Sequence, residues 1–144
     1  MIETLQTPRQ GWMGLLARAK PDRLAHLLPD VVPYDVLRGP EVGAVMVRGR
    51  VGGTGQPFNL GEMTVTRCSV RVGDTVGHAH VQGRDKTHAL RAAVLDALMQ
   101  TDVALQAQVL LPLEAEETAA RSLRAAKAAA TKVEFFTLVR GEDK

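Results

Sequence analysis

The stretch TVTRCSVRVGDTVGHAHVQGRDKTHALRAAVLDALM, residues 64–99, decides the fold. At its start the side chains alternate: Thr66, Cys68 and Val70 share one face, with arginine and serine between them. A period of two residues is typical of a half-buried β-strand. Extended back along the chain, the pattern predicts one long strand from Phe58 to Val72.

The same stretch predicts a further strand and a helix behind it. Gly73-Asp74 is a turn pair, and Thr75 to Val81 is expected to return as an antiparallel strand. Asp85 is a suitable N-cap for a helix from Lys86 to Gln100, which holds neither glycine nor proline between those ends. The wide Ala/Leu face of this helix predicts that it lies across the sheet as the main core helix.

Upstream, two valine-containing runs predict more strands, from Tyr34 to Leu37 and from Val42 to Val51. The segment Gly52 to Pro57 follows, and its three glycines permit positive φ. A hairpin is therefore expected between the second run and the long strand.

The N-terminal arm, residues 1–30, is predicted to be helical. Thr7 to Gln10 has the Thr-Pro-x-Gln pattern of a helix start, Pro21 interrupts the helix, and Asp22 to Leu28 resumes it. The arm has little of its own to pack against, so it is expected to dock on the sheet or on another chain.

The C-terminal part is predicted to be helical and then extended. A short helix is expected from Asp102 to Leu111, ended by Pro112, and an Ala-rich helix from Glu114 to Lys132. Its alanines bury little area, so a close partner is expected to stabilise it. The aromatic run Val133 to Val139 is expected to be extended.

Together these elements predict an α+β fold: an antiparallel β-meander of about three to five strands covered by helices, with helical extensions at both ends. The 144 residues, 45% of them hydrophobic, are expected to form a single domain. Its parts are the arm (1–30), the sheet with its core helix (34–111) and the Ala-rich helix with the aromatic tail (112–144).

Composition excludes several classes of protein. A formal net charge of +2 is too small to indicate nucleic-acid binding, although residues 48–91 carry seven basic and three acidic side chains. A single cysteine, Cys68, excludes an internal disulfide and fits a reducing cytosol. The sequence has neither a signal-peptide pattern nor a run of roughly 18 apolar residues, so a cytoplasmic protein without a membrane span is expected.

The histidines raise a metal-binding hypothesis. His78 and His80 alternate on one strand face and His88 follows on the helix, so the imidazoles could meet one ion. No carboxylate or thiolate stands at a diagnostic spacing, so hydrogen-bonded or solvent-facing histidines and no metal are expected.

Cys68 fits core packing better than catalysis, because no neighbouring histidine or helix start would activate its thiol. Hydrolase and nucleotide-triphosphatase motifs are absent.

Two segments could bind an anion. The first is the hairpin loop with Arg48 and Arg50 beside it, whose backbone amides and one hydroxyl come from Gly52, Gly53, Thr54 and Gly55. A plain loop is the alternative.

The second segment lies where a strand leads into a helix N-terminus, and it comprises Gln82, Gly83, Arg84, Asp85 and Lys86. A helix-capping Asp85 would occupy the same amides as a phosphate, and an Arg84-Asp85 pair could instead fasten a second subunit.

At these segments the sequence resembles the G subunit of the carbon-phosphorus lyase core complex, the PhnG family. The resemblance covers most of the chain and rests on three blocks: Gly52 to Gly55 with Phe58 and Thr66-Arg67; Val81 to Lys86 with His88 and Asp96 to Met99; and Phe135 to Thr137 with Val139 to Gly141. His78 and His80 fall outside it. No catalytic residue is carried over, and Arg67 and His88 join the two segments as candidate anion-binding or subunit-contact residues.

The resemblance implies a role in organophosphonate breakdown. Members of the family act with the H, I and J subunits and with an ATP-binding-cassette-like L subunit. The implied step, α-D-ribose 1-methylphosphonate 5-triphosphate synthesis, moves the ribose 5-triphosphate unit of MgATP onto the phosphonate and releases adenine. The resemblance assigns nucleosidase chemistry to the I subunit and iron-sulfur radical chemistry to the J subunit.

The family therefore implies a chain with no cofactor of its own, with MgATP as a substrate of the complex. We expect a subunit that supports the I subunit and is not catalytic alone. Two alternatives stay open. In one, the Gly52 loop, Arg67, Arg84 and Lys86 converge on a triphosphate and take part in catalysis. In the other, the chain is a stand-alone phosphate-binding or other anion-binding module.

Overall fold

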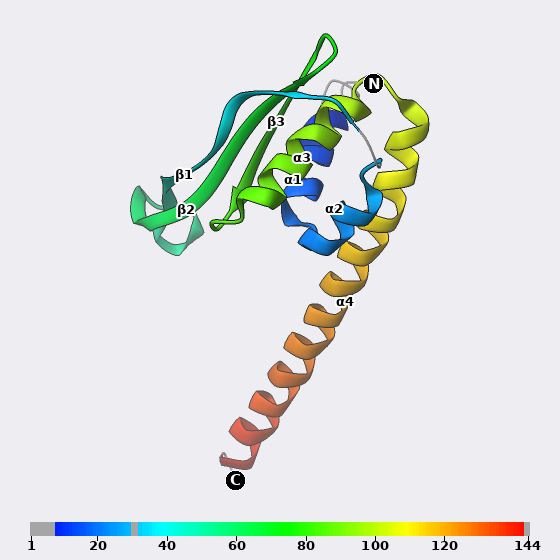
Figure 1. The fold of residues 1–144 in the computed structure, drawn as a ribbon. Coiled ribbons are helices and arrows are strands. Elements are labelled where there is room, and N and C mark those ends of the chain that lie inside the picture. Colours follow the sequence, from blue (N-terminus) through cyan, green and yellow to red (C-terminus); the bar gives the residue numbers. More distant parts are fainter. Residues whose placement is uncertain (1–7, 30–31, 143–144) are drawn as a thin grey trace. The chain divides into compact units, whose positions relative to one another are not determined.

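The computed structural model describes residues 8–29 and 32–142, with side chains described as far as residue 131. Its contacts group into two compact units, residues 1–110 and 111–144. The first unit holds the sheet and most of the helices (Figure 1). Thr7, the expected N-cap of the first helix, lies outside the described residues.

The sheet is antiparallel and three-stranded, in the order β1-β2-β3. Its strands are β1 (Asp35–Arg50), β2 (Pro57–Val72) and β3 (Thr75–Gln82). Consecutive strands are neighbours, so the predicted meander and the α+β class are confirmed. The turn at Gly73 and the long second strand also lie where the alternation placed them.

β1 is one strand, and the prediction of two separate strands before the hairpin is wrong. The pairing of β1 with β2 passes through register shifts between Val36 and Arg38 and between Arg38 and Glu41. Gly39 and Pro40 lie in this irregular part. β1 is an edge strand, where a proline that lacks an N–H removes no necessary ladder bond, so the strand continues past it.

The hairpin loop between β1 and β2 is confirmed. Val51–Gly53 forms a single 3-10 turn, η2, in which Gly52 has φ 64° and Gly53 has φ 84°. These left-handed values are rare for residues with a Cβ. The glycines therefore close the hairpin.

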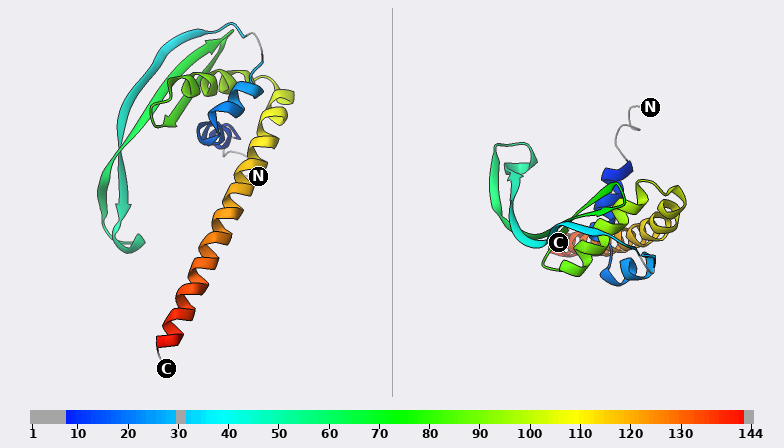
Figure 2. Two further views of the ribbon diagram at one scale, coloured as in Figure 1. Left: turned by 60° about the horizontal axis from the view of Figure 1, so that its bottom comes forward. Right: turned by 45° about the horizontal axis from the view of Figure 1, so that its top comes forward.

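β1 and β2 extend far beyond the end of β3. β3 pairs only with residues 65–72 of β2, whereas the β1–β2 ladder continues to Arg50 opposite Pro57. Figure 2 shows the extension as a curved two-stranded ribbon. We call residues 43–50 and 57–65 the hairpin ribbon.

Helix α3 (Lys86–Met99) is the predicted core helix and lies across one face of the sheet (Figure 1). The helix approaches β3 so closely that a Cβ placed on Gly77 would meet Ala93 O and would stand 2.6 Å from Ala97 N. The side chains of β2 that face it, Thr66, Cys68 and Val70, are at most 1% exposed. Alanines on α3 and a glycine on β3 thus allow backbone to meet backbone.

The N-terminal arm forms α1 (Pro8–Arg18) and α2 (Pro21–Leu27), as predicted. α1 packs against β3 and α3, and α2 packs against α3. Buried side chains of the arm complete the core of this unit; they are Trp12, Leu15, Leu16 and Leu24. The arm was expected to dock on the sheet or on another chain, and it docks on the sheet and core helix of its own chain.

Helix α4 runs without interruption from Val103 to Glu142, so the predicted break at Pro112 and the predicted extended run 133–139 are both wrong. Asp102 starts the helix by accepting a 3.0 Å hydrogen bond from Leu105 N. Strong helix formers flank the proline, and adding residues to an existing helix is far easier than nucleating one. The aromatic run meets no glycine before Gly141 and continues the helix.

In the second unit, every residue from Thr118 to Thr131 is exposed. A partner for this Ala-rich part of α4 stays a prediction. None of the helices in the described residues is long and apolar enough to span a membrane.

Candidate functional site

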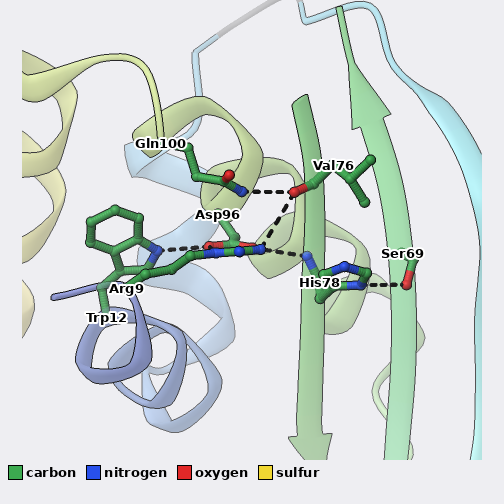
Figure 3. A network of polar contacts seen from close by, with 7 residues as sticks. All are labelled: Arg9, Trp12, Ser69, Val76, His78, Asp96 and Gln100. Carbon is green, nitrogen blue, oxygen red and sulfur yellow. Dashed lines mark hydrogen bonds and ion pairs between the residues drawn. The ribbon is translucent and has the colours of Figure 1, made fainter. Parts of the chain in front are cut away.

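Among the side chains that the structure describes, the most extensive polar network lies around Asp96 on α3, whose side chain is fully buried (Figure 3). Asp96 Oδ1 accepts hydrogen bonds from Trp12 Nε1 at 2.7 Å and Arg9 Nε at 3.1 Å. Asp96 Oδ2 accepts from Arg9 Nη2 at 2.9 Å and from His78 N at 2.9 Å. Four donors on α1 and β3 therefore satisfy one carboxylate of α3.

A neighbouring carbonyl extends the network. Val76 O accepts 2.7 Å from Gln100 Nε2 and 3.4 Å from Arg9 Nη2. The hydrogen bond to Asp96 raises the pKa of the Arg9 guanidinium, partly opposed by its burial. Arg9 thus stays charged at every pH at which the protein folds.

This network fastens elements together and leaves no reactive group free. A carboxylate whose four acceptor positions are all occupied has no lone pair for a metal ion or a substrate proton. Breaking such a buried pair leaves an uncompensated charge, which costs several kcal/mol. We conclude that Asp96 holds α1 on the sheet.

The sequence motifs assign Asp96 no role of its own. A signal was present, because Asp96 is a single acid within the apolar run AAVLDALM of the core helix. A carboxylate in such a position must find donors. Arg9 and Trp12, one helical turn apart on the arm, are suited to supply them.

At the corner between β3 and α3, Asp85 acts as the helix cap. Its Oδ1 accepts from His88 N at 2.9 Å, so it occupies an amide that a phosphate would use. Gly83 is held by Thr64 O, which accepts from its amide at 2.8 Å, and by Thr66 Oγ1, which donates to its carbonyl at 2.7 Å. Exposed side chains border this ordered corner; they are Gln82, Arg84 and Lys86.

The hairpin loop closes mainly on itself. The amides of Thr54 and Gly55 both donate to Val51 O, the latter at 2.8 Å. Arg50 Nη1 donates to Gly55 O at 3.1 Å. Among the loop residues Gly52, Gly53, Thr54 and Gly55, two of the amides are therefore already used, and anion binding here stays a prediction.

The histidines point in different directions. His78 Nδ1 lies 2.8 Å from Ser69 Oγ on the exposed side of the sheet, and His80 is exposed beside it. His88 is 2% exposed, and its Nε2 lies 2.9 Å from Leu16 O, under α1. In the described part of the chain, no group of three or more His, Cys, Asp or Glu side chains is arranged to hold a metal ion.

Cys68 is a core residue, 1% exposed, on the face that meets α3. Burial raises the pKa of its thiol. A protonated, inaccessible thiol is a poor nucleophile.

The two predicted anion segments do not converge. The corner is fixed to β2 at Thr64, where Gly83 donates its amide hydrogen bond, whereas the hairpin loop meets β2 at Pro57. Seven residues of β2, roughly 20 Å of strand, therefore separate the two segments. Arg67 lies further along β2, on the face of the sheet that α3 does not cover. A single triphosphate could not contact the loop, the corner and Arg67 on one chain.

Comparisons with known proteins agree with the motif resemblance. The chain is 46% identical over 148 aligned residues to α-D-ribose 1-methylphosphonate 5-triphosphate synthase subunit PhnG of Rhizobium meliloti (strain 1021), and the alignment covers 94% of this chain and 90% of that protein. The family model described as phosphonate metabolism protein PhnG matches residues 7–141.

These matches extend over both units of the fold. Together with the fold, they identify the chain as an α+β protein of phosphonate metabolism. Within that class, it belongs to the PhnG family.

Proposed function

We propose that this chain is a subunit of an α-D-ribose 1-methylphosphonate 5-triphosphate synthase in organophosphonate breakdown. The observation that carries the proposal is the 46% identity to a synthase subunit across 94% of the chain. An identity of 46% along almost the whole chain supports the same role, as a subunit of the same kind of complex.

The proposed reaction is a transfer at C1′ of the ribose of MgATP. A phosphonate oxygen forms a bond to C1′, the bond from C1′ to the adenine nitrogen breaks, and adenine leaves after taking up a proton. The partners proposed for this chain are the H, I and J subunits, with the L subunit for the transfer step, in the cytoplasm. The chain itself carries no cofactor in this proposal.

Within that complex the chain acts as a scaffold that supports the catalytic subunit. Three features favour this role over direct catalysis. Asp96 has no free acceptor position, Asp85 already caps α3, and the cationic candidates lie at separate places on the chain. These observations favour a supporting role over proton transfer or charge stabilisation at the ribose by this chain.

The test is reconstitution of the complex with and without this chain, with adenine release from MgATP and methylphosphonate as the readout. The scaffold role predicts that omission lowers both the amount of assembled complex and adenine release. The double variant Arg84→Ala, Lys86→Ala should retain assembly and release. If it assembles normally but releases adenine at least tenfold more slowly, the corner contacts the substrate and the catalytic alternative holds.

A further inference from the structure

Among the described residues of the first unit, no helix packs on one of the two faces of the sheet. Gly77 and Val70 pair with each other on the face that meets α3. Side chains of neighbouring residues in a strand point to opposite faces, so Ser69 and His78, which form the next pair, lie on the other face. We call this the outer face; both views in Figure 2 show it without a covering helix from the first unit.

Along the hairpin ribbon the outer face is apolar. In the register of β1 with β2, the pairs Val45–Met63 and Gly49–Phe58 lie on this outer face. A further register shift, between Val47 and Arg48, leaves Leu60 of β2 unpaired. The Cδ1 atom of Leu60 is 3.1 Å from where a Cβ on Gly49 would be, so Leu60 lies on this face too. The opposite face of the ribbon is more polar: Glu62 lies opposite Met46 there, and Asn59 lies opposite Arg48.

These apolar side chains are open to solvent. Leu60 is 61% exposed, Phe58 43% and Val45 40%. A two-stranded ribbon is marginally stable in water without a surface to cover it. A contiguous apolar patch on such a ribbon marks an interaction site.

At the base of the ribbon the outer face carries a cation with an unmet hydrogen bond. Arg67 Nε is buried without a partner, while the rest of the side chain is partly exposed. Its nearest carboxylate, Glu41, lies 3.9 Å from Nη2 and is held at 2.6 Å by Arg38. Arg67 therefore lacks a close acceptor.

We propose that the outer face docks a different protein chain that lays apolar side chains on the hairpin ribbon and offers a carboxylate to Arg67. The inference rests on the proposed function, since the partner is another subunit of the synthase complex. A second copy of this chain fits poorly: on the described outer face, Asp35 is paired with Arg71 and Glu41 with Arg38. Such a copy has no unpaired carboxylate there for Arg67.

Thiol protection tests the proposal directly. Single cysteines are introduced by Val45→Cys and Leu60→Cys on the outer face and by Met46→Cys on the opposite face, where Met46 is 51% exposed. Native Cys68 is 1% exposed and does not react. Maleimide labelling is compared between the full chain alone and the complex assembled by co-expression with the H, I and J subunits. Assembly should slow labelling of the first two at least tenfold and leave the third unchanged.

Association is measured with two further substitutions and a matched control. Val45→Asp and Arg67→Glu should each reduce co-purification with the co-expressed subunits at least tenfold. Met46→Asp places the same charge one residue away on the other face of the same ribbon and should leave co-purification unchanged.

The outcomes separate the two proposals. If the wild-type chain does not associate with the other subunits, the proposed function fails and this inference fails with it. If it associates but Val45→Cys labels as fast in the complex as alone, the outer face is free and only this inference is overturned. Protection of Val45→Cys by self-association of the isolated chain would assign the face to a second copy, which also overturns it.

Discussion

Trp12 Nε1 donates a 2.7 Å hydrogen bond to Asp96 Oδ1, which joins α1 to a helix residue 84 positions further along the chain. The same carboxylate accepts from the backbone of β3 through His78 N. One buried side chain thereby connects the arm, the sheet and the core helix. The arm carries much of the core's leucine content, so this connection determines whether the core is complete.

Replacing Asp96 should therefore destabilise the whole first unit. Asp96→Ala leaves the donors of Arg9, Trp12 and His78 without their acceptor. Arg9 is 35% exposed and can turn to water, but each buried donor left unsatisfied costs about 1–3 kcal/mol, so we expect a loss of about 2–5 kcal/mol in the free energy of unfolding. Thermal and urea unfolding of the full chain within its complex measure the change.

Asp102→Ala is the matched control for Asp96→Ala. Asp102 also accepts a backbone hydrogen bond on a helix, but it is exposed, and loss of such a cap costs about 1 kcal/mol. Equal destabilisation by the two substitutions would contradict the role given to Asp96.

Stability should fall at alkaline pH because of Cys68. Burial raises the pKa of its thiol above the ordinary value of 9.0, so the folded chain keeps a proton that the unfolded chain gives up. This contribution is fully present below about pH 9 and is lost as pH rises toward the folded-state pKa, at up to about 1.4 kcal/mol per pH unit.

Unfolding free energies measured from pH 7 to pH 10.5 test this. Cys68→Ala lacks the thiol and should show a shallower decline than the wild type, although the lost side-chain volume lowers its stability at every pH. Parallel curves for the two proteins would show that the thiol makes no contribution.

Much of the fold could be predicted because local patterns and packing agree. The alternation predicted the strand and that Thr66, Cys68 and Val70 share one face, and this is the face that meets α3. Asp85 was predicted as a helix cap and acts as one. In these segments propensity, periodicity and burial point to the same structure.

The errors lie at element boundaries. Two separate strands are predicted before the hairpin and a helix end at Pro112, yet an edge strand and a long helix continue through both places. The Asp96 network joins residues more than 80 positions apart, and no local pattern specifies such a pairing. The anion segments are predicted from a glycine-rich loop and a helix N-terminus, patterns that do not report which amides the chain already uses internally, and anion binding there stays a prediction.

Pro112 should weaken α4 locally, although the helix continues. Proline has no N–H to donate to the carbonyl of Gln108 and costs about 3 kcal/mol relative to alanine inside a helix. Pro112→Ala should slow amide hydrogen exchange in residues 113–118 by up to about 100-fold. Leu111→Ala, at a 66% exposed position in the same turn, should change it little. Unchanged exchange in Pro112→Ala would show that the proline imposes no local weakness.

Gly77 should be the least replaceable glycine of the sheet. A Cβ there would collide with Ala93 O and stand 2.6 Å from Ala97 N, both backbone atoms of α3 that no side-chain rotation can move. Gly77→Ala must push the core helix off β3, so we expect destabilisation of about 3 kcal/mol or more, at or above the upper end of ordinary overpacking.

Gly43→Ala is the control, since its Cβ would meet nothing closer than Arg67 Nη2 at 3.7 Å. Urea unfolding of both variants separates the effect of close helix packing from the general effect of adding a methyl group to a strand. A Gly77→Ala variant as stable as Gly43→Ala would mean that α3 can retreat from the sheet without loss.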